Sequence, residues 1–258
     1  MAKRPSHSDF DRYYQALYPE RWPVLRHALM EERSPIALTE GLTQPYWLDE
    51  ASLLAAQSLG VEKGDAVLDM CAAPGGKTLV LALALDGDGS LVANDRSSER
   101  RSRLRRVITD HLDERQRSVI TVTSHDATKW SLYEREAYDK ILLDAPCSSE
   151  RHVLSDARAL GMWSPSRPRR LATTQFAMLA AALEAVKIGG KILYCTCSIN
   201  AGENEDVIEK LHGRRAGRFV EEPVDLAGSE RRQWGQIILP DTADGKGPLY
   251  LSLIRRIS

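Results

Sequence analysis

Short apolar runs alternate with longer amphipathic or alanine-rich stretches over most of the chain after residue 65. Apolar runs of four or five residues are typical of buried strands, and the longer stretches have the spacing of helices. The pattern predicts strands at 66–70, 91–94, 119–122, 140–144, 191–195, 236–239 and 249–253. It predicts helices at 76–85, 98–112, 171–186 and 203–211.

The alternation of strands and helices predicts an α/β fold. Strands that are separated by helices pair in parallel, and the helices cover both faces of the sheet. The last two strands flank Asp244-Gly245-Lys246-Gly247, which predicts a closing hairpin. We expect Gly189-Gly190 to end the helix at 171–186. The prediction is a mostly parallel, Rossmann-like sheet of seven strands with a C-terminal antiparallel hairpin.

Residues 1–60 have a different pattern. Phe10, Tyr13, Tyr14 and Leu17 recur at near-helical spacing, and a further amphipathic helix is expected at 48–56. We therefore predict an N-terminal helical extension over 1–60 and a catalytic domain over 61–258. The apolar residues of the extension are expected to cover one face of the core, while its aromatic residues could also support a substrate.

The composition narrows the class of protein. The 258 residues are 43% hydrophobic and 28% charged, and the net charge of −1 gives no bulk attraction to nucleic acid. A nucleic-acid partner would need a local basic patch, and two arginine clusters could supply one by contacting phosphates. They comprise Arg100, Arg101, Arg103, Arg105 and Arg106, and Arg167, Arg169 and Arg170.

Four cysteines are too few for a disulfide scaffold and suit a reducing compartment. The polar amino terminus is not a secretory signal, so we do not expect a secreted protein. No apolar run approaches the ~20 residues that a membrane span needs. We expect no membrane association.

The segment 69–78, Asp-Met-Cys-Ala-Ala-Pro-Gly-Gly-Lys-Thr, leads from the first of these strands into a helix. Small residues let the backbone approach a ligand closely, and a helix amino terminus favours an anionic group such as a carboxylate. The phosphate-loop pattern of nucleotide hydrolases is unsatisfied, because Cys71 stands where it requires Gly.

Two acidic residues follow the next strands. Asp95 is placed to accept hydrogen bonds from ribose hydroxyls, and Asp126 to meet an adenine amino group. Taken alone, Asp95 could be a solvated aspartate and Asp126 a turn or helix cap. Together with the glycine-containing loop they favour a nucleoside ligand.

Two cysteines follow later strands: Cys147 in Asp144-Ala-Pro-Cys-Ser148 and Cys197 in Thr196-Cys-Ser198. A thiolate at a strand end is a good carbon nucleophile. Asp144 could hydrogen-bond an exocyclic amine. Buried, inert cysteines are the common alternative. Metal binding by Cys195-x-Cys197 lacks further ligands, so no metal is expected.

Together these motifs resemble the Nop/Sun family of RNA (cytosine-5)-methyltransferases, over roughly residues 45–210. The resemblance implies a class I methyltransferase fold with S-adenosylmethionine as cofactor. It implies that Cys197 attacks cytosine C6 so that C5 accepts the methyl group, that Cys147 assists product release, and that Asp144 and Lys77 adjoin the base. The residues that it implies for cofactor binding are Cys71, Ala72, Ala73, Pro74, Gly75, Gly76, Lys77, Asp95, Arg100, Asp126, Ala127 and Asp144.

The resemblance extends to a subgroup. Arg151-His152 and Gly247-Pro-Leu-Tyr250 resemble compact mitochondrial-type members that act on small-subunit rRNA or on tRNA. The expected partner is therefore RNA, with rRNA favoured over tRNA. Cys195 departs from the family, which commonly has Ser or Thr there. DNA cytosine-5 enzymes, which use the Pro-Cys cysteine as nucleophile, are disfavoured by the Thr-Cys-Ser motif.

Some expectations concern the setting of the enzyme. No sizeable RNA-binding domain is expected before the core, so RNA recognition would use the short amino-terminal region, the arginine clusters or a separate protein. We expect a monomer or weak oligomer, in the cytoplasm if the chain is bacterial and in the mitochondrial matrix if it is organellar. A catalytically silent, cofactor-binding RNA or ribosome-assembly factor on the same fold is the alternative function.

Overall fold

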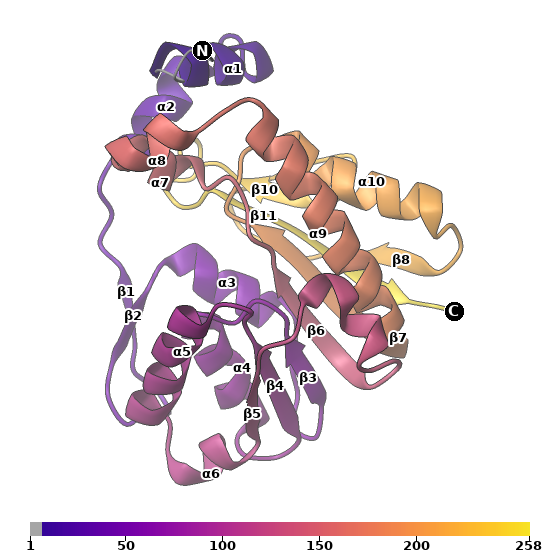
Figure 1. Ribbon diagram of the computed structural model, residues 1–258. Helices are drawn as coiled ribbons and strands as arrows, with labels where there is room; N and C mark the ends of the chain where they lie inside the picture. Colours follow the sequence, from indigo (N-terminus) through magenta and orange to yellow (C-terminus); the bar gives the residue numbers. More distant parts are fainter. Residues whose placement is uncertain (1–6) are drawn as a thin grey trace.

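The computed structural model describes residues 7–258, and it is built around one mixed sheet (Figure 1). Within that range the sheet has nine strands, in the order β5-β4-β3-β6-β7-β11-β10-β9, with β8 also paired to β11. Strands β5, β4, β3, β6 and β7 are parallel, and β11 and β10 form the expected antiparallel hairpin. The strands are β3 (Ala66–Asp69), β4 (Ser90–Asn94), β5 (Ile120–Thr123), β6 (Tyr138–Asp144), β7 (Val186–Thr196), β8 (Phe219–Glu222), β9 (Ser229–Arg231), β10 (Gln236–Ile238) and β11 (Leu249–Arg256).

The seven predicted strands are all present, but the predicted count of seven is wrong. Strands β8 and β9 add to the antiparallel end of the sheet, where they pair with β11 and β10. Both are short and carry charged residues, so their apolar pattern is weak. Pairing with an exposed strand edge, which the pattern of one segment does not encode, makes them strands.

The end of the long helix α9 (Ser166–Ala185) also differs from the prediction. Strand β7 begins directly at Val186, and Gly189-Gly190 lie inside the strand instead of ending the helix. A Cβ atom at Gly190 would lie 2.8 Å from the carbonyl oxygen of Asp139 on β6. The glycine thus permits a close backbone approach beside an irregularity in the β6–β7 pairing.

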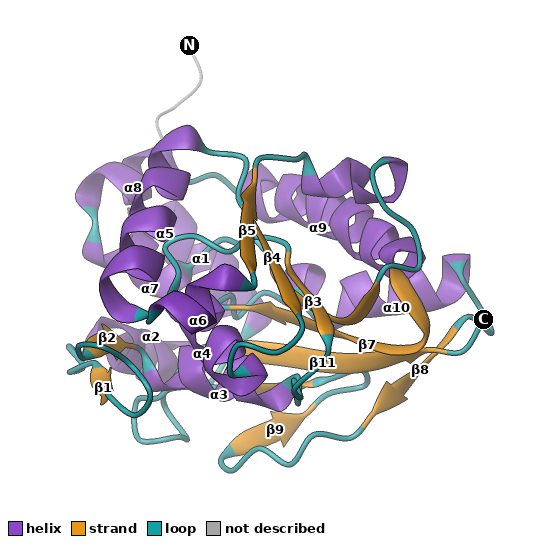
Figure 2. Ribbon diagram, turned by 90° about the horizontal axis from the view of Figure 1, so that it is seen from below, coloured by secondary structure: helices purple, strands orange, loops and turns teal. Residues whose placement is uncertain are grey.

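Helices cover both faces of the sheet, as expected (Figure 2). One apolar core joins α3, α4 and α5 to one face, and a second joins η1, α9 and α10 to the other. The elements on the first face are α3 (Glu50–Ser58), α4 (Gly76–Leu85), α5 (Ser98–His111) and the short α6 (Glu114–Ser118) nearby. Those of the second region are η1 (Ala127–Leu132), α7 (Glu150–Ser155), α8 (Ala157–Met162), η2 (Ala201–Glu203) and α10 (Glu205–Arg214).

The N-terminal region packs on the segment that follows β6. Helices α1 (His7–Leu17) and α2 (Trp22–Met30) bury Phe10, Tyr14 and Trp22 against Trp163, with ring centroids of Phe10 and Trp163 5.0 Å apart. The suggestion that these aromatic residues support a substrate is wrong for Phe10 and Tyr14, because both rings are buried. The Tyr14 hydroxyl instead donates to the carboxylate of Glu150, the first residue of α7.

A small hairpin that the sequence pattern does not predict follows α2. It consists of β1 (Ile36–Leu38) and β2 (Tyr46–Leu48), and it leads into α3. Trp47 on β2 is 62% exposed. Among residues 7–258, no helix is both long enough and apolar enough to cross a membrane.

Candidate active site

The carboxyl ends of the parallel strands meet at one edge of the sheet, and Asn94 holds three of them together. Its side-chain nitrogen donates to the carbonyl oxygens of Met70 (3.0 Å) and His125 (3.2 Å), and its oxygen accepts from the His125 backbone (2.7 Å). Sequence reasoning gave Asn94 no such role. The sequence does contain one signal for this role, which is an asparagine at the end of a predicted buried strand.

A cavity of about 340 Å³, here called the strand-end cavity, lies beside these strand ends. It brings together five of the predicted cofactor residues from four different segments. They are Cys71, Asp95, Arg100, Asp126 and Ala127. Apolar atoms of Met70, Pro146 and Met178 complete a slot of the kind that an aromatic ring can enter.

The two carboxylates of the strand-end cavity are fixed by local hydrogen bonds. Asp95 accepts from the backbone of Ser97 at 2.9 Å, and its second oxygen lies 3.4 Å from the Arg100 guanidinium. Asp126 caps η1 by accepting from Thr128, which lowers the pKa of the Asp126 carboxyl. Its cap role and its place in the cavity coexist, and it is an ionised acceptor at neutral pH.

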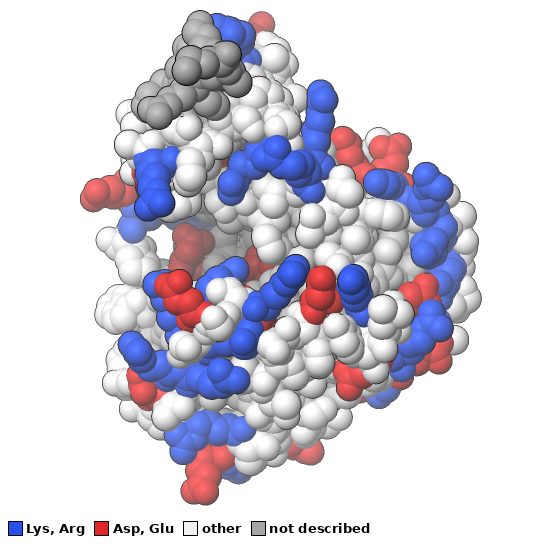
Figure 3. All heavy atoms as spheres, viewed as in Figure 1, with Lys and Arg blue, Asp and Glu red and all other residues white. Residues whose placement is uncertain are grey.

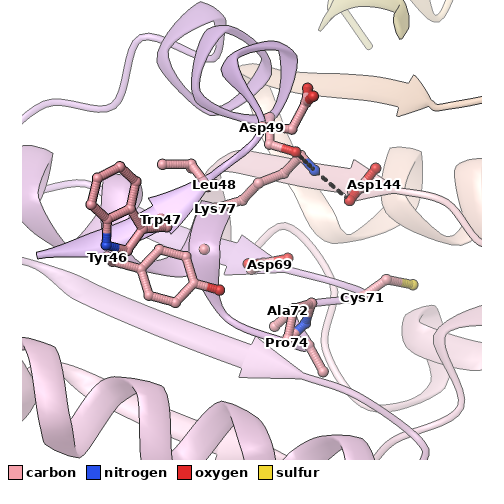
Figure 4. Close-up of a pocket in the computed structure, with 13 residues that line it drawn as sticks. Tyr46, Trp47, Leu48, Asp49, Asp69, Cys71, Ala72, Pro74, Lys77 and Asp144 are labelled. Atoms are coloured by element: carbon pink, nitrogen blue, oxygen red, sulfur yellow. Dashed lines mark hydrogen bonds and ion pairs between the residues drawn. The ribbon is translucent and has the colours of Figure 1, made fainter. Parts of the chain in front are cut away.

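The glycine-containing loop borders a second, smaller cavity, the loop cavity. Its wall includes Ala72, Ala73, Pro74, Gly76 and Lys77 from the loop, opposite Tyr46 and Trp47 of β2 (Figure 4). Cys71 lines both cavities, so they adjoin.

Gly75 lines none of the cavities described here, and its contribution is conformational. Its φ of 125° is a backbone conformation that favours glycine, and a Cβ atom there would lie 2.9 Å from Val107. The two ends of the loop are also linked, because the Thr78 hydroxyl donates to the Asp69 carboxylate at 2.8 Å. Burial raises the pKa of Asp69 to about 7.

Lys77 and Asp144 form an ion pair on the wall of the loop cavity. The Lys77 ammonium lies 2.7 Å from an Asp144 carboxylate oxygen and 3.2 Å from the Ser52 hydroxyl (Figure 4). Burial lowers the pKa of Lys77, but the neighbouring Asp144 outweighs this and raises it above its usual value. Lys77 is therefore a fixed cation.

The third cavity, the thiol cavity, measures about 420 Å³ and contains the nucleophile predicted from sequence. Cys197, Ser149, Lys77 and Asp144 line it, and it shares Lys77 and Asp144 with the loop cavity. Arg151 fixes the rim of this cavity by donating to the carbonyl oxygens of Glu31 and Gly247, each at 2.9 Å. Its place in a family motif did not predict this structural role. The volume suits a nucleobase.

The two predicted catalytic cysteines are in contact. Their sulfur atoms lie 3.1 Å apart, and the Ser149 hydroxyl oxygen lies 3.0 Å from the Cys197 sulfur. Cys197 is exposed, whereas Cys147 is half-buried. Hydrogen bonding with Cys147, and then with Ser149, lowers the pKa of Cys197, while hydrogen bonding with Cys197 and burial raise that of Cys147. Cys197 is thus the better thiolate of the pair.

The third thiol near the site is a different case. Cys195 is fully buried, and its sulfur lies 3.6 Å from Asp144. Burial raises the pKa of Cys195, so this thiol stays neutral and protonated. Among the described residues, no three His, Cys, Asp or Glu side chains come together as a metal site would require.

Comparison with known proteins gives the site a family context. Residues 56–254 match the family model described as 16S rRNA methyltransferase RsmB/F. The chain is 37% identical to the 5-cytosine rRNA methyltransferase NSUN4 of Bos taurus over 84% of its length and 61% of the relative's. It is 33% identical to the mitochondrial tRNA (cytosine(34)-C(5))-methyltransferase of Danio rerio over 85% of its length and 62% of the relative's.

The fold has a close counterpart among solved structures. A methyltransferase homolog protein from Pyrococcus horikoshii superposes with a TM-score of 0.75 at 22% identity, over 96% of this chain and 94% of that one. This agreement establishes the methyltransferase fold predicted from sequence. The chain spans about three fifths of the length of the curated relatives that it matches.

Proposed function

Because the chain belongs to the RsmB/F family of 16S rRNA methyltransferases, we propose that it methylates C5 of a cytosine in RNA through a covalent bond to Cys197. The observation that carries this proposal is the thiol cavity. It combines an exposed cysteine of lowered pKa with a fixed Lys77–Asp144 pair on a wall shared with the loop cavity.

The residues around the two other cavities fit S-adenosylmethionine. Two carboxylates, Asp95 and Asp126, are the acceptors that ribose hydroxyls and an adenine amino group require. The amino terminus of α4 faces the loop cavity, where it suits a carboxylate. When bound, S-adenosylmethionine supplies a methyl group on a positively charged sulfur. Lys77 and Asp144 lie where this group and the base would meet.

The residues of the thiol cavity divide the chemistry among them. The Cys197 thiolate adds to C6 of the cytosine, which makes C5 electron-rich enough to accept a methyl group. Asp144 and Lys77 hydrogen-bond the polar edge of the base while charge develops on it, a preorganised electrostatic effect. Once C5 carries the methyl group, its proton passes to water, the electrons of that C–H bond restore the C5–C6 double bond, and Cys197 leaves C6 as a thiolate. Cys147, which lies beside Cys197, assists this release.

The target cytosine must leave its base stack, because C6 is shielded within it. Figure 3 has Lys and Arg side chains gathered around a hollow between the α7–α8 region and the α3–α5 region. Exposed Arg169 and Arg170 at the start of α9 are candidates for contacts to RNA phosphates. Residues 61–258 would form the catalytic domain, and residues 1–60 would aid RNA binding.

The RNA favoured by this proposal is small-subunit rRNA, with tRNA as the second candidate. Both kinds of RNA occur in the names of relatives, and the family description names 16S rRNA. A relative named as mitochondrial supports the mitochondrial matrix as one compartment, with the bacterial cytoplasm as the other. The remaining specificity would come from a separate protein or from further parts of a longer chain.

The test is methyl transfer from labelled S-adenosylmethionine to rRNA and tRNA, followed by bisulfite sequencing of the RNA. The expected result is one protected cytosine, which is absent with Cys197→Ala. Cofactor binding without methylation of either RNA would contradict the proposal and favour a silent assembly factor.

A further inference from the structure

Ser149 has a backbone conformation that is uncommon for its residue type. Its φ of 52° and ψ of 62° lie in the left-handed region, which residues with a Cβ atom adopt rarely. Such a conformation persists only where the surrounding structure fixes it, and it often marks a functional site. Ser149 directly follows the Pro-Cys-Ser segment and precedes α7.

Hydrogen bonds on both sides of Ser149 fix this conformation. The backbone nitrogen of Ser148 donates to the Glu203 carboxylate at 2.9 Å. The buried Glu150 carboxylate accepts from the Ser198 hydroxyl at 2.9 Å and from the backbone of Ile199 at 3.1 Å. The flanking residues are thus tied to the segment that follows Cys197, so the two cysteine-bearing segments are held in register.

The consequence is the position of the Ser149 hydroxyl. Its oxygen lies 3.0 Å from the Cys197 sulfur and 3.5 Å from the Cys147 sulfur. We propose that Ser149 donates a hydrogen bond to the Cys197 sulfur and thereby maintains it as the attacking thiolate. The effect on catalysis rests on the proposed function, whereas the effect on the thiol itself does not.

The charges around Cys197 explain why a hydroxyl donor matters. Although the residue is exposed, desolvation of the Cys197 sulfur acts against the thiolate, and so do the negative charges of Asp144 on β6 and Glu150 on α7. Lys77 on α4 is a nearby cation, but it is paired with Asp144, and Arg151 and His152 of α7 also line the thiol cavity. The hydrogen bonds that favour the Cys197 thiolate come from Cys147 and Ser149, and Cys147 has a second task in product release.

Ser149→Gly is the decisive variant, because glycine favours the left-handed conformation and lacks the hydroxyl. The experiment measures alkylation of Cys197 by iodoacetamide in the full chain as a function of pH, with peptide mass spectrometry to identify the modified cysteine. We expect the midpoint of the profile to rise by about one pH unit, as for loss of a hydrogen bond to a charged group. Methyl transfer at neutral pH should fall, with the KM for RNA unchanged.

Two further variants separate chemistry from folding. Asp86→Gly also introduces a glycine at a left-handed residue, the C-cap of α4, and should leave the alkylation profile of Cys197 unchanged. Ser149→Ala keeps the Cβ atom and removes only the hydroxyl, so its profile should shift as that of Ser149→Gly does. Thermal melting of each variant establishes that it is folded.

The outcomes distinguish this proposal from the proposed function. An unchanged Cys197 profile in folded Ser149→Gly would overturn the role of Ser149, whether or not the chain methylates RNA. If the profile shifts but the chain methylates no RNA, the hydrogen bond from Ser149 to Cys197 is supported and the proposed methyltransferase function is rejected.

Discussion

The buried carboxyl of Glu150 should make the stability of the protein depend on pH in an unusual direction. Burial, and next the nearby Glu203 carboxylate, raise the pKa of Glu150 from 4.5 to about 7. As pH rises, the unfolded chain loses this proton first, so the free energy of unfolding falls between about pH 4.5 and pH 7. At ~1.4 kcal/mol per pKa unit, the share of Glu150 is about 3 kcal/mol.

Glu150→Gln should remove this share. The Gln amide can turn its oxygen toward the backbone of Ile199 and its nitrogen toward the hydroxyls of Tyr14 and Ser198, which can accept as well as donate. Urea unfolding of both proteins from pH 5 to pH 7.5 gives the difference between their free energies of unfolding. The variant should gain about 2 kcal/mol relative to the unmodified chain between pH 5 and pH 7.5, because part of the change lies below pH 5.

The control for this experiment is Glu209→Gln, which changes an exposed glutamate on α10. Its difference from the unmodified chain should stay constant with pH. A difference for Glu150→Gln that is equally constant would refute the reasoning, because it would mean that Glu150 titrates alike in the folded and unfolded states.

Three further predictions concern the proposed reaction. Lys77→Met leaves Asp144 without its cation and should lower kcat of methyl transfer by roughly 100-fold or more; near-normal turnover would exclude a role in the chemical step. Asp95→Ala should weaken S-adenosylmethionine binding in calorimetry by roughly 10- to 100-fold, and an unaltered Kd would remove Asp95 from the ribose site. Replacing Arg169 and Arg170 by Ala should raise the KM for RNA and reduce the salt dependence of binding by roughly 0.7 per phosphate contact, with kcat unchanged. An unaltered salt dependence would place the RNA elsewhere.

Much of the fold follows from local patterns in the sequence. Apolar runs with polar ends mark the central strands, because a strand covered on both faces has few other compositions. The short edge strands β8 and β9 and the β1–β2 hairpin escape this reasoning, since their pairing depends on neighbours that are remote in sequence. Gly190 is a similar case. Its backbone lies close to that of β6, and this contact becomes visible only when the two strands are paired.

The candidate site also has features that local motifs predict and features that depend on long-range contacts. The motifs predict which segments meet, and the structure brings Cys147 and Cys197 into contact, with Lys77 and Asp144 on the wall of the same cavity. Long-range contacts could not be predicted, such as the 2.5 Å hydrogen bond from Tyr14 to Glu150 across 136 positions. The left-handed conformation of Ser149 depends on the same network. The unequal acidity of the two thiols is a product of geometry that motif order alone does not supply.

The most direct test of the account is the covalent complex between enzyme and RNA. The unmodified chain, Cys197→Ala and Cys147→Ala are each incubated with S-adenosylmethionine and the unmethylated form of the RNA substrate, and the mixtures are separated on a denaturing gel. We expect a stable RNA–protein complex for Cys147→Ala, because addition proceeds while release is impaired, and no complex for Cys197→Ala. A complex that forms with Cys197→Ala and is lost with Cys147→Ala would contradict the account and make Cys147 the nucleophile.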